Sequence, residues 1–219
     1  AVEFEIAGEW AEALRFLDRH VRGPAPDATP DRLLFYFTLG ERRWKWTRSW
    51  PPGGVERRSF YPGSDGRLDL EPEAERGRQA LPVEAGCTRG PANRWRTVEL
   101  FFRSRRGLAI EEVGRRLVWL GAPLEHPLEI TGTPVAHLRV LPSGEDALLF
   151  LYLDALAPGG ALLPLTEGAL RAAHRPAAGR GPEMRSFLRL DFTPLKPGEE
   201  LLHSFELPPI SVLVRSEEH

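Results

Sequence analysis

Residues 128–175, LEITGTPVAHLRVLPSGEDALLFLYLDALAPGGALLPLTEGALRAAHR, decide the fold of this chain. Strand-length apolar runs at 135–141 and 148–153 alternate with turn-forming segments at 142–146 and 157–160. Short apolar runs between turns that contain Pro and Gly are typical of antiparallel β-structure. The stretch contains no grouping of side chains with obvious chemistry, which favours a structural β-domain over a self-contained catalyst.

The pattern of short strands extends outward along the chain. Residues 59–61 and 67–70 flank Pro-Gly-Ser-Asp-Gly at 62–66, which predicts a hairpin. Residues 71–93 are rich in Pro, Gly and charge and predict a surface loop, whereas residues 109–114 stay ambiguous. Further strands are predicted at 33–39, 97–102, 117–120, 187–192, 200–207 and 211–214. We therefore expect a mainly β fold, built as an antiparallel sandwich.

One helix is predicted before this β region, over residues 9–22. Four apolar residues recur in it at spacings of four, three and four, which places them on one helical face: Trp10, Leu14, Leu17 and Val21. Gly23 can adopt the left-handed conformation that closes a helix, and Pro24 cannot continue one. The helix is therefore amphipathic and ends at a defined point.

Composition excludes several classes of protein. The 219 residues carry 29 basic and 31 acidic side chains, so the chain lacks the basic field on which nucleic-acid binding relies. Cys87 is the only cysteine, which excludes an intrachain disulfide and a cysteine-based zinc cluster. No apolar segment approaches the length of a membrane span, and the first residues lack the pattern of a signal peptide. We expect a cytoplasmic location, with secretion as the alternative.

Two blocks of sequence carry a family resemblance. The first consists of LRFLDRHVRG at 14–23 and LLFYFTLGERRWKWTRSWPP at 33–52, in which the matching positions are Phe16, Asp18, Arg19, Gly23, Gly40, Trp44 and Trp50-Pro51. The second lies within 123–215 and includes PLEITG at 127–132, PGG at 158–160, TEG at 166–168 and PLKPGE at 194–199. Together they resemble X-Pro dipeptidyl-peptidase and cocaine-esterase-type (CocE/NonD) hydrolases.

The resemblance implies a fold and a division of the chain. Residues 1–24 would be the terminal helix of an α/β-hydrolase domain. Residues 25–219 would form the C-terminal, galactose-binding-like jelly-roll sandwich, without its last strands. In the family this domain covers part of the catalytic domain and helps to shape the substrate cleft.

The resemblance also implies where the chemistry lies. Enzymes of the family use a Ser–Asp–His triad whose serine sits in a G-x-S-x-G turn. Ser64 comes closest to that context, but Pro62 stands where the first glycine is required, and His20 belongs to the helix motif. We expect no catalytic residue in this chain and no activity of the chain alone, although its parent family consists of serine hydrolases. The alternative function is a stand-alone, lectin-like jelly roll that binds a carbohydrate or a partner.

The candidate cleft or interface residues are Trp44, Trp46, Trp50 and Tyr36, with Phe60 nearby. They could form an aromatic platform for a sugar or an acyl group. The simpler interpretation, which we favour, is that they fill the seam between the helical segment and the sandwich, because aromatic side chains dominate buried contact area.

No cofactor and no metal site are predicted. His126, His137, His174 and His203 lack the spacing of zinc ligands. Asp146, Asp154 and Glu167 could ligate calcium, but capping of turns explains them more simply. Arg94, Arg96 and the run at 103–106 predict a solvated basic loop, and Cys87 is not expected to be a catalytic thiol. The expected partners are an α/β-hydrolase catalytic domain, in the same protein or as a complementary fragment, and a second copy of the chain, with no nucleic acid and no membrane.

Overall fold

The computed structural model describes residues 6–23, 33–74, 77–83, 108–109, 116–174 and 187–216. Within these residues the chain forms one α-helix and twelve short strands, so the predicted mainly β fold is confirmed. The elements are α1 (Ile6–Val21), β1 (Leu34–Thr38), β2 (Arg43–Thr47), β3 (Tyr61–Pro62), β4 (Arg67–Asp69), β5 (Leu108–Ala109), β6 (Leu120–Gly121), β7 (Leu128–Gly132), β8 (Val135–Val140), β9 (Leu148–Leu156), β10 (Ala161–Arg171), the 3-10 helix η3 (Arg189–Asp191), β11 (Leu201–Glu206) and β12 (Ile210–Val214). Nearly all pairings between them are antiparallel, with β4 and β6 as a short parallel pair.

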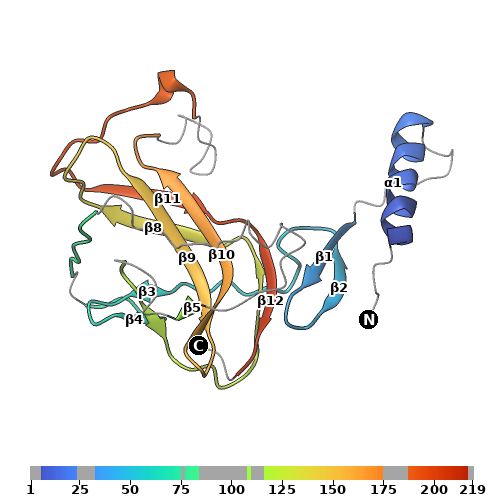
Figure 1. Ribbon diagram of the computed structural model, residues 1–219, viewed down its shortest axis with the longest axis horizontal. Helices are drawn as coiled ribbons and strands as arrows, with labels where there is room; N and C mark the ends of the chain where they lie inside the picture. Colours follow the sequence, from blue (N-terminus) through green and yellow to red (C-terminus); the bar gives the residue numbers. More distant parts are fainter. Residues whose placement is uncertain are drawn as a thin grey trace.

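Two antiparallel pairs, β7 with β12 and β8 with β11, follow one another along the chain as a single bent ribbon (Figure 1). The register shifts by one residue between the pair Gly132↔Ile210 and the pair Val135↔Glu206. Proline has no N–H to donate to a ladder, and Pro134 lies at this break. Its carbonyl oxygen still accepts a hydrogen bond of 2.8 Å from the Leu207 amide. The ribbon therefore bends at Pro134 without separation of its two strands.

The hairpin of β9 and β10 packs across this bent ribbon and forms the core with it. β10 has a bulge at Leu165, and the adjacent Thr166 hydroxyl donates to the Pro208 carbonyl at 3.1 Å, at the bend of the ribbon. One apolar cluster joins β9 and β10 to β8 and β11: Ala136, Leu138, Leu149, Leu151, Leu153, Leu170, Phe205 and Leu207. A second joins the other end of the hairpin to β7 and β12: Leu124, Ile130, Ala155, Leu163, Leu165, Ile210, Val212 and Val214. The core thus lies between two β layers.

The layers approach closely at Gly168. A Cβ added there would lie 3.0 Å from Leu207 and 3.1 Å from Phe205. Burial of a side chain such as Leu207 or Phe205 stabilises the folded state by about 1.5–3 kcal/mol, so this contact contributes substantially to holding the layers together.

The β1–β2 hairpin is attached to the edge of β12 (Figure 1). The Leu39 amide donates to the Ser211 carbonyl at 2.9 Å, and the Leu213 amide donates to the Leu39 carbonyl at 2.8 Å. Gly40 follows with φ of 80°, and a Cβ on it would collide with the Leu213 carbonyl oxygen. Glycine is therefore required where the hairpin meets the sandwich.

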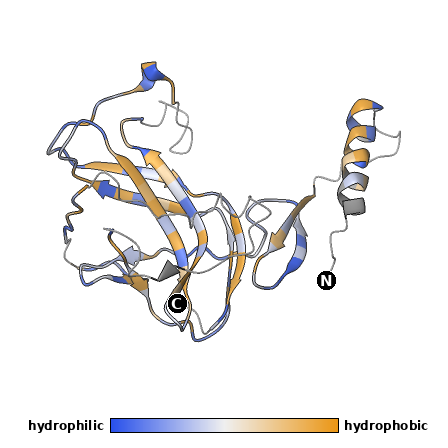
Figure 2. Cartoon of the chain, in the orientation of Figure 1, coloured by the Kyte–Doolittle hydropathy of each residue, from blue (hydrophilic) through white to orange (hydrophobic). Residues whose placement is uncertain are grey.

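Helix α1 lies apart from the β layers (Figure 1), and hydrophobic and hydrophilic residues alternate along it (Figure 2). Trp10 is 66 % exposed and Val21 76 % exposed, and Leu14, Phe16 and Leu17 are also exposed. Gly23 ends the helical segment with φ of 93°, as predicted. No helix in the described ranges is long and apolar enough to cross a membrane.

Several predicted elements need correction. The strand predicted at 187–192 is wrong: residues 189–191 form η3, and Phe192 makes only an isolated bridge with His174. Four strands, β2, β5, β7 and β10, were not predicted, although β10 is the longest in the described part of the chain. Pro164 and Gly168 made β10 resemble loop sequence, but the bulge accommodates the irregularity. The strand at 97–102 and most of 109–114 lie outside the described residues.

Candidate interaction surface on the β1–β2 hairpin

Register divides the side chains of the β1–β2 hairpin between two faces. Phe35 pairs with Trp46, and Phe37 with Trp44, so these four residues point to one side of the hairpin. The Phe37 and Trp44 rings contact each other, with centroids 5.4 Å apart. Phe35 and Trp46 are 60 % and 61 % exposed. We call Phe35, Phe37, Trp44 and Trp46 the aromatic face.

The other two predicted site residues lie together on the opposite side. The Tyr36 ring meets the Trp50 ring edge to face, with centroids 5.4 Å apart. The Trp50 indole N–H donates to the Thr133 hydroxyl at 3.0 Å, at the bend of the ribbon. Pro51 packs beside Gly132. Tyr36 and Trp50 therefore anchor the hairpin, whereas Trp44 and Trp46 face outward, so the predicted four-residue platform is divided in two.

A chain of hydrogen bonds runs beneath the hairpin. The Thr38 and Ser211 hydroxyls are 2.9 Å apart, and the Ser211 and Thr131 hydroxyls 2.8 Å apart. Thr131 donates to Glu129 Oε1 at 2.8 Å, and Lys45 Nζ donates to Glu129 Oε2 at 2.7 Å. The three hydroxyl residues are buried, and Thr38 is fully enclosed. We call Thr38, Ser211, Thr131, Glu129 and Lys45 the polar chain.

Electrostatics favour the charged state of both ionisable members of the polar chain. Burial by itself would lower the pKa of Lys45, but hydrogen bonds to Glu129 and Glu41, together with the attraction of their charges, raise it above its usual value. Burial would raise the pKa of Glu129, but hydrogen bonds from Lys45 and Thr131 and the lysine charge lower it. The pair is therefore ionised at neutral pH.

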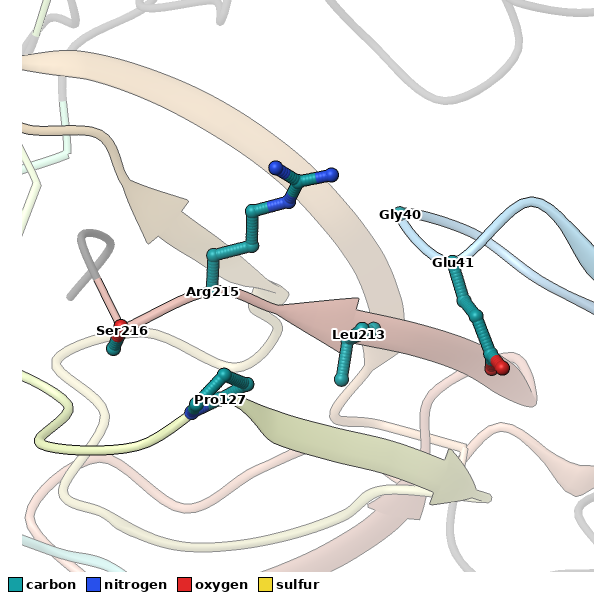
Figure 3. Close-up of a pocket in the computed structure, with 6 residues that line it drawn as sticks. All are labelled: Gly40, Glu41, Pro127, Leu213, Arg215 and Ser216. Atoms are coloured by element: carbon teal, nitrogen blue, oxygen red, sulfur yellow. The ribbon is translucent and has the colours of Figure 1, made fainter.

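A shallow hollow of about 460 Å³ lies beside the hairpin attachment (Figure 3). It is lined by Gly40, Glu41, Pro127, Leu213, Arg215 and Ser216. The Arg215 and Glu41 side chains extend in different directions, so their charges do not converge on one point (Figure 3). Nothing in this hollow resembles a catalytic arrangement.

Two further residues considered in the sequence analysis, Asp146 and Ser64, make local contacts. Asp146 accepts from the Ala147 amide at 2.9 Å and from Arg171 Nε at 2.8 Å, which confirms the predicted turn chemistry. Ser64 bonds through its amide and its hydroxyl to Glu73 Oε1 in the β3–β4 turn. Among the residues that the structure describes, no three His, Cys, Asp or Glu side chains gather as metal ligands. Cys87, Arg94, Arg96 and 103–106 lie outside them.

Sequence reasoning missed Phe35, Phe37 and the whole polar chain. The hairpin members could have been found by pairing 33–39 with the following residues through the turn at Gly40, because alternation then puts residues 35, 37, 44 and 46 on one side. The polar chain had no such signal, since its members come from strands that are far apart in sequence.

Comparison with curated proteins gives two relatives, "Putative serine esterase Mb1866c" of Mycobacterium bovis (strain ATCC BAA-935 / AF2122/97) and "Putative serine esterase MT1883" of Mycobacterium tuberculosis (strain CDC 1551 / Oshkosh). Each is 33 % identical over 214 residues, which cover 92 % of this chain and 33 % of the relative. The chain thus spans one third of the length of these relatives.

Solved structures with the same fold include an aminopeptidase from a marine sediment archaeon, Thaumarchaeota archaeon (TM-score 0.66, 21 % identity, 96 % of this chain and 36 % of that one). An α-amino acid ester hydrolase matches with a TM-score of 0.63 at 20 % identity over 93 % of this chain and 34 % of that one. A CocE/NonD family hydrolase from Staphylococcus aureus matches with a TM-score of 0.61 at 15 % identity over 98 % and 37 %.

The family match is decisive for most of the chain. Residues 27–216 match the X-Pro dipeptidyl-peptidase C-terminal non-catalytic domain, and the resemblance noted in the sequence is thereby confirmed. The β layers, the bent ribbon and the attached hairpin described above all lie within these residues. The chain belongs to the family of X-Pro dipeptidyl-peptidase C-terminal non-catalytic domains.

Proposed function

We propose that this chain is the non-catalytic β-domain of a serine hydrolase of the X-Pro dipeptidyl-peptidase or acyl-esterase type, and that it helps to shape the substrate cleft. Residues 25–219 form a galactose-binding-like jelly roll, and residues 1–24 belong to the end of an α/β-hydrolase domain. The identity of 33 % over nearly the whole chain with proteins named as serine esterases supports this proposal.

The observation that carries the proposal is the pair of exposed apolar surfaces, one on α1 and one on the aromatic face. Trp10 and Trp46 are each more than 60 % exposed, and each has exposed apolar neighbours. Contiguous apolar surface of this kind marks a binding site, because its contact with water is unfavourable. An isolated helix of 16 residues is also marginal in water without a partner for its apolar side. An α/β-hydrolase catalytic domain is the partner that would cover both.

The first experiment tests where the chemistry resides. The purified chain is assayed on acyl-nitrophenyl esters and on Ala-Pro-anilide, and no turnover is expected. The same chain is then fused in place of the matching third of the M. bovis esterase, where fluorophosphonate-sensitive turnover is expected. Fluorophosphonate-sensitive turnover by the chain alone would refute the non-catalytic assignment.

The second experiment tests the contact surface. Trp46→Ser removes an exposed aromatic ring from the aromatic face, and Phe150→Ser removes an equally exposed ring, 59 % against 61 %, from β9. We expect Trp46→Ser to weaken binding of the chain to the separately expressed catalytic part of the esterase, measured by calorimetry, and Phe150→Ser to leave it unchanged. Equal loss in both variants would mean that the aromatic face is not the specific contact.

The exposed tryptophans also favour the alternative proposal, a lectin-like jelly roll in which Trp44 and Trp46 stack on a sugar. Binding on a glycan array that is lost in Trp44→Ala would support this alternative. The amphipathic α1 argues against it, because a free lectin has no use for a helix with an uncovered apolar side. Self-association and a cytoplasmic location are further parts of the proposal.

A further inference from the structure

The direction of every hydrogen bond in the polar chain follows from the charge of Glu129. A carboxylate can only accept hydrogen bonds, so the Thr131 hydroxyl donates its single hydrogen to Glu129. The Ser211 hydroxyl must then donate to Thr131, and the Thr38 hydroxyl must donate to Ser211. Each of the three buried hydroxyls therefore donates to the next, from Thr38 to Ser211 to Thr131, and the last donates to the ionised carboxylate of Glu129.

This order of bonds ties both strands of the hairpin to the sandwich. Thr38 is on β1 and Lys45 is on β2, whereas Ser211 belongs to β12 and both Glu129 and Thr131 to β7. The polar chain thus begins on one strand of the hairpin, passes through β12 and β7, and ends on the other strand of the hairpin. In the described residues, the backbone hydrogen bonds between the hairpin and β12 run through Leu39, which directly follows β1. Contacts between side chains, more than these backbone hydrogen bonds, must therefore fix the orientation of the hairpin relative to the sandwich.

We propose that the polar chain is a clamp that sets the orientation of the aromatic face, and that Lys45 and Glu129 are positioning residues for the parent hydrolase. Neither residue would touch substrate. Each acts by holding the surface that meets the catalytic domain, and this second part rests on the proposed function. Hydrogen bonds to charged groups are among the stronger ones. Loss of one partner would also leave the buried hydroxyls of Thr38, Ser211 and Thr131 without their ordered chain of bonds.

Hydrogen exchange of the chain by itself tests the clamp. Glu129→Gln removes the charge that orders the hydroxyls and places an amide against the Lys45 ammonium. The matched control is Glu200→Gln, which breaks another ion pair across two strands, the 3.2 Å contact with Arg139 between the end of β8 and the start of β11. We expect amides of β1 and β2 to exchange roughly tenfold faster in Glu129→Gln, with β9 and β10 unchanged, and no hairpin effect in Glu200→Gln. Unchanged hairpin exchange, or equal acceleration throughout, would overturn the clamp.

A conservative pair keeps the test decisive if Glu129→Gln fails to fold. Lys45→Arg retains a charged donor and is expected to preserve slow exchange in the hairpin. Lys45→Met removes the donor but keeps the aliphatic stem and is expected to accelerate it. The clamp is overturned if the two variants behave alike.

Kinetics of the fusion with the esterase catalytic part test the positioning role. Glu129→Gln is expected to raise KM with kcat nearly unchanged, because the cleft is displaced and the reacting groups are intact. If exchange responds but only Trp46→Ser raises KM, the positioning role is refuted. If both variants leave KM unchanged while exchange still responds, the proposed function is what fails. The two failures are therefore distinguishable.

Discussion

Gly40 lies where the β1–β2 hairpin meets the sandwich, and alanine substitutions at Gly40 and Gly54 together separate backbone strain from steric collision. Gly40→Ala would combine an unfavourable positive φ, a cost of about 1–2 kcal/mol, with a collision against the Leu213 carbonyl. Gly54 has nearly the same φ, 84° against 80°, but nothing lies within 4 Å of its added Cβ. We expect Gly40→Ala to lower the free energy of unfolding in urea clearly more than Gly54→Ala does. Equal losses would show that the close approach contributes nothing.

The Lys45–Glu129 pair predicts how the hairpin responds to pH. The pKa of Glu129 is lower in the folded state than its usual 4.5, so its stabilising contribution is complete above that value and is lost as pH falls through the folded pKa. The pKa of Lys45 is raised above 10.5, so its contribution is complete below that value and is lost only as pH rises through the folded pKa.

Both contributions are therefore at their maximum between about pH 5 and pH 10. We expect hairpin amide protection, corrected for intrinsic exchange, to fall below about pH 4 in the wild-type chain, whereas Glu129→Gln is expected to lack this acid step. An acid step of equal size in both proteins would assign the transition to other carboxylates. The effect is modest because Glu129 is 37 % exposed and solvent screens the pair.

Among the elements, α1 and β10 differ strongly in how far a leucine side chain is exposed to solvent. Leu14 of α1 is 58 % exposed, whereas Leu170 of β10 is 2 % exposed. We expect Leu170→Ala to lower the free energy of unfolding by about 2–5 kcal/mol, because it leaves a cavity between the layers. Leu14→Ala is expected to change it by less than about 0.5 kcal/mol. Chemical denaturation followed by circular dichroism measures both, and a large loss in Leu14→Ala would mean that α1 packs on the sandwich.

The elements also show what could be predicted from sequence. Helix α1, β8 and β11 follow a clear periodicity or a strand-length apolar run between turns, and each was predicted within a few residues of its observed bounds. β10 was missed because Pro164 and Gly168 interrupt its pattern, and their tolerance depends on the bulge and on the opposing ring of Phe205. Residues 187–192 are apolar enough for a strand, but within the described ranges their only strand-like pairing is the bridge between Phe192 and His174.

The candidate site also has one part that could be predicted from the sequence and one part that could not. The four predicted site residues, Tyr36, Trp44, Trp46 and Trp50, were found because they lie close together in the sequence. Their division into an outward pair and an anchoring pair required the register of β1 with β2. The polar chain depends on contacts over 80 or more positions along the chain, between Ser211 and its neighbours Thr131 and Thr38. Local sequence carries no information about such contacts.

At the scale of the whole molecule, exposed apolar surface predicts self-association of the chain on its own. The aromatic face and the apolar side of α1 remain in contact with water in the described structure, and burial of apolar area yields about 25 cal/mol per Å². A second copy can cover these surfaces when no catalytic domain does. We expect a concentration-dependent shift from monomer to dimer in sedimentation velocity, which Trp46→Ser weakens and Phe150→Ser does not.

Competition distinguishes this association from an unrelated contact. Because the same surface is proposed to meet the catalytic domain, adding the catalytic part of the esterase should convert dimers of the chain into one-to-one complexes. The stoichiometry follows from geometry: a face that is covered by one partner is closed to the other. Dimers that persist beside a bound catalytic part would place self-association elsewhere on the molecule, with the outer side of β9, where Leu148 and Phe150 are exposed, as the surface to mutate next.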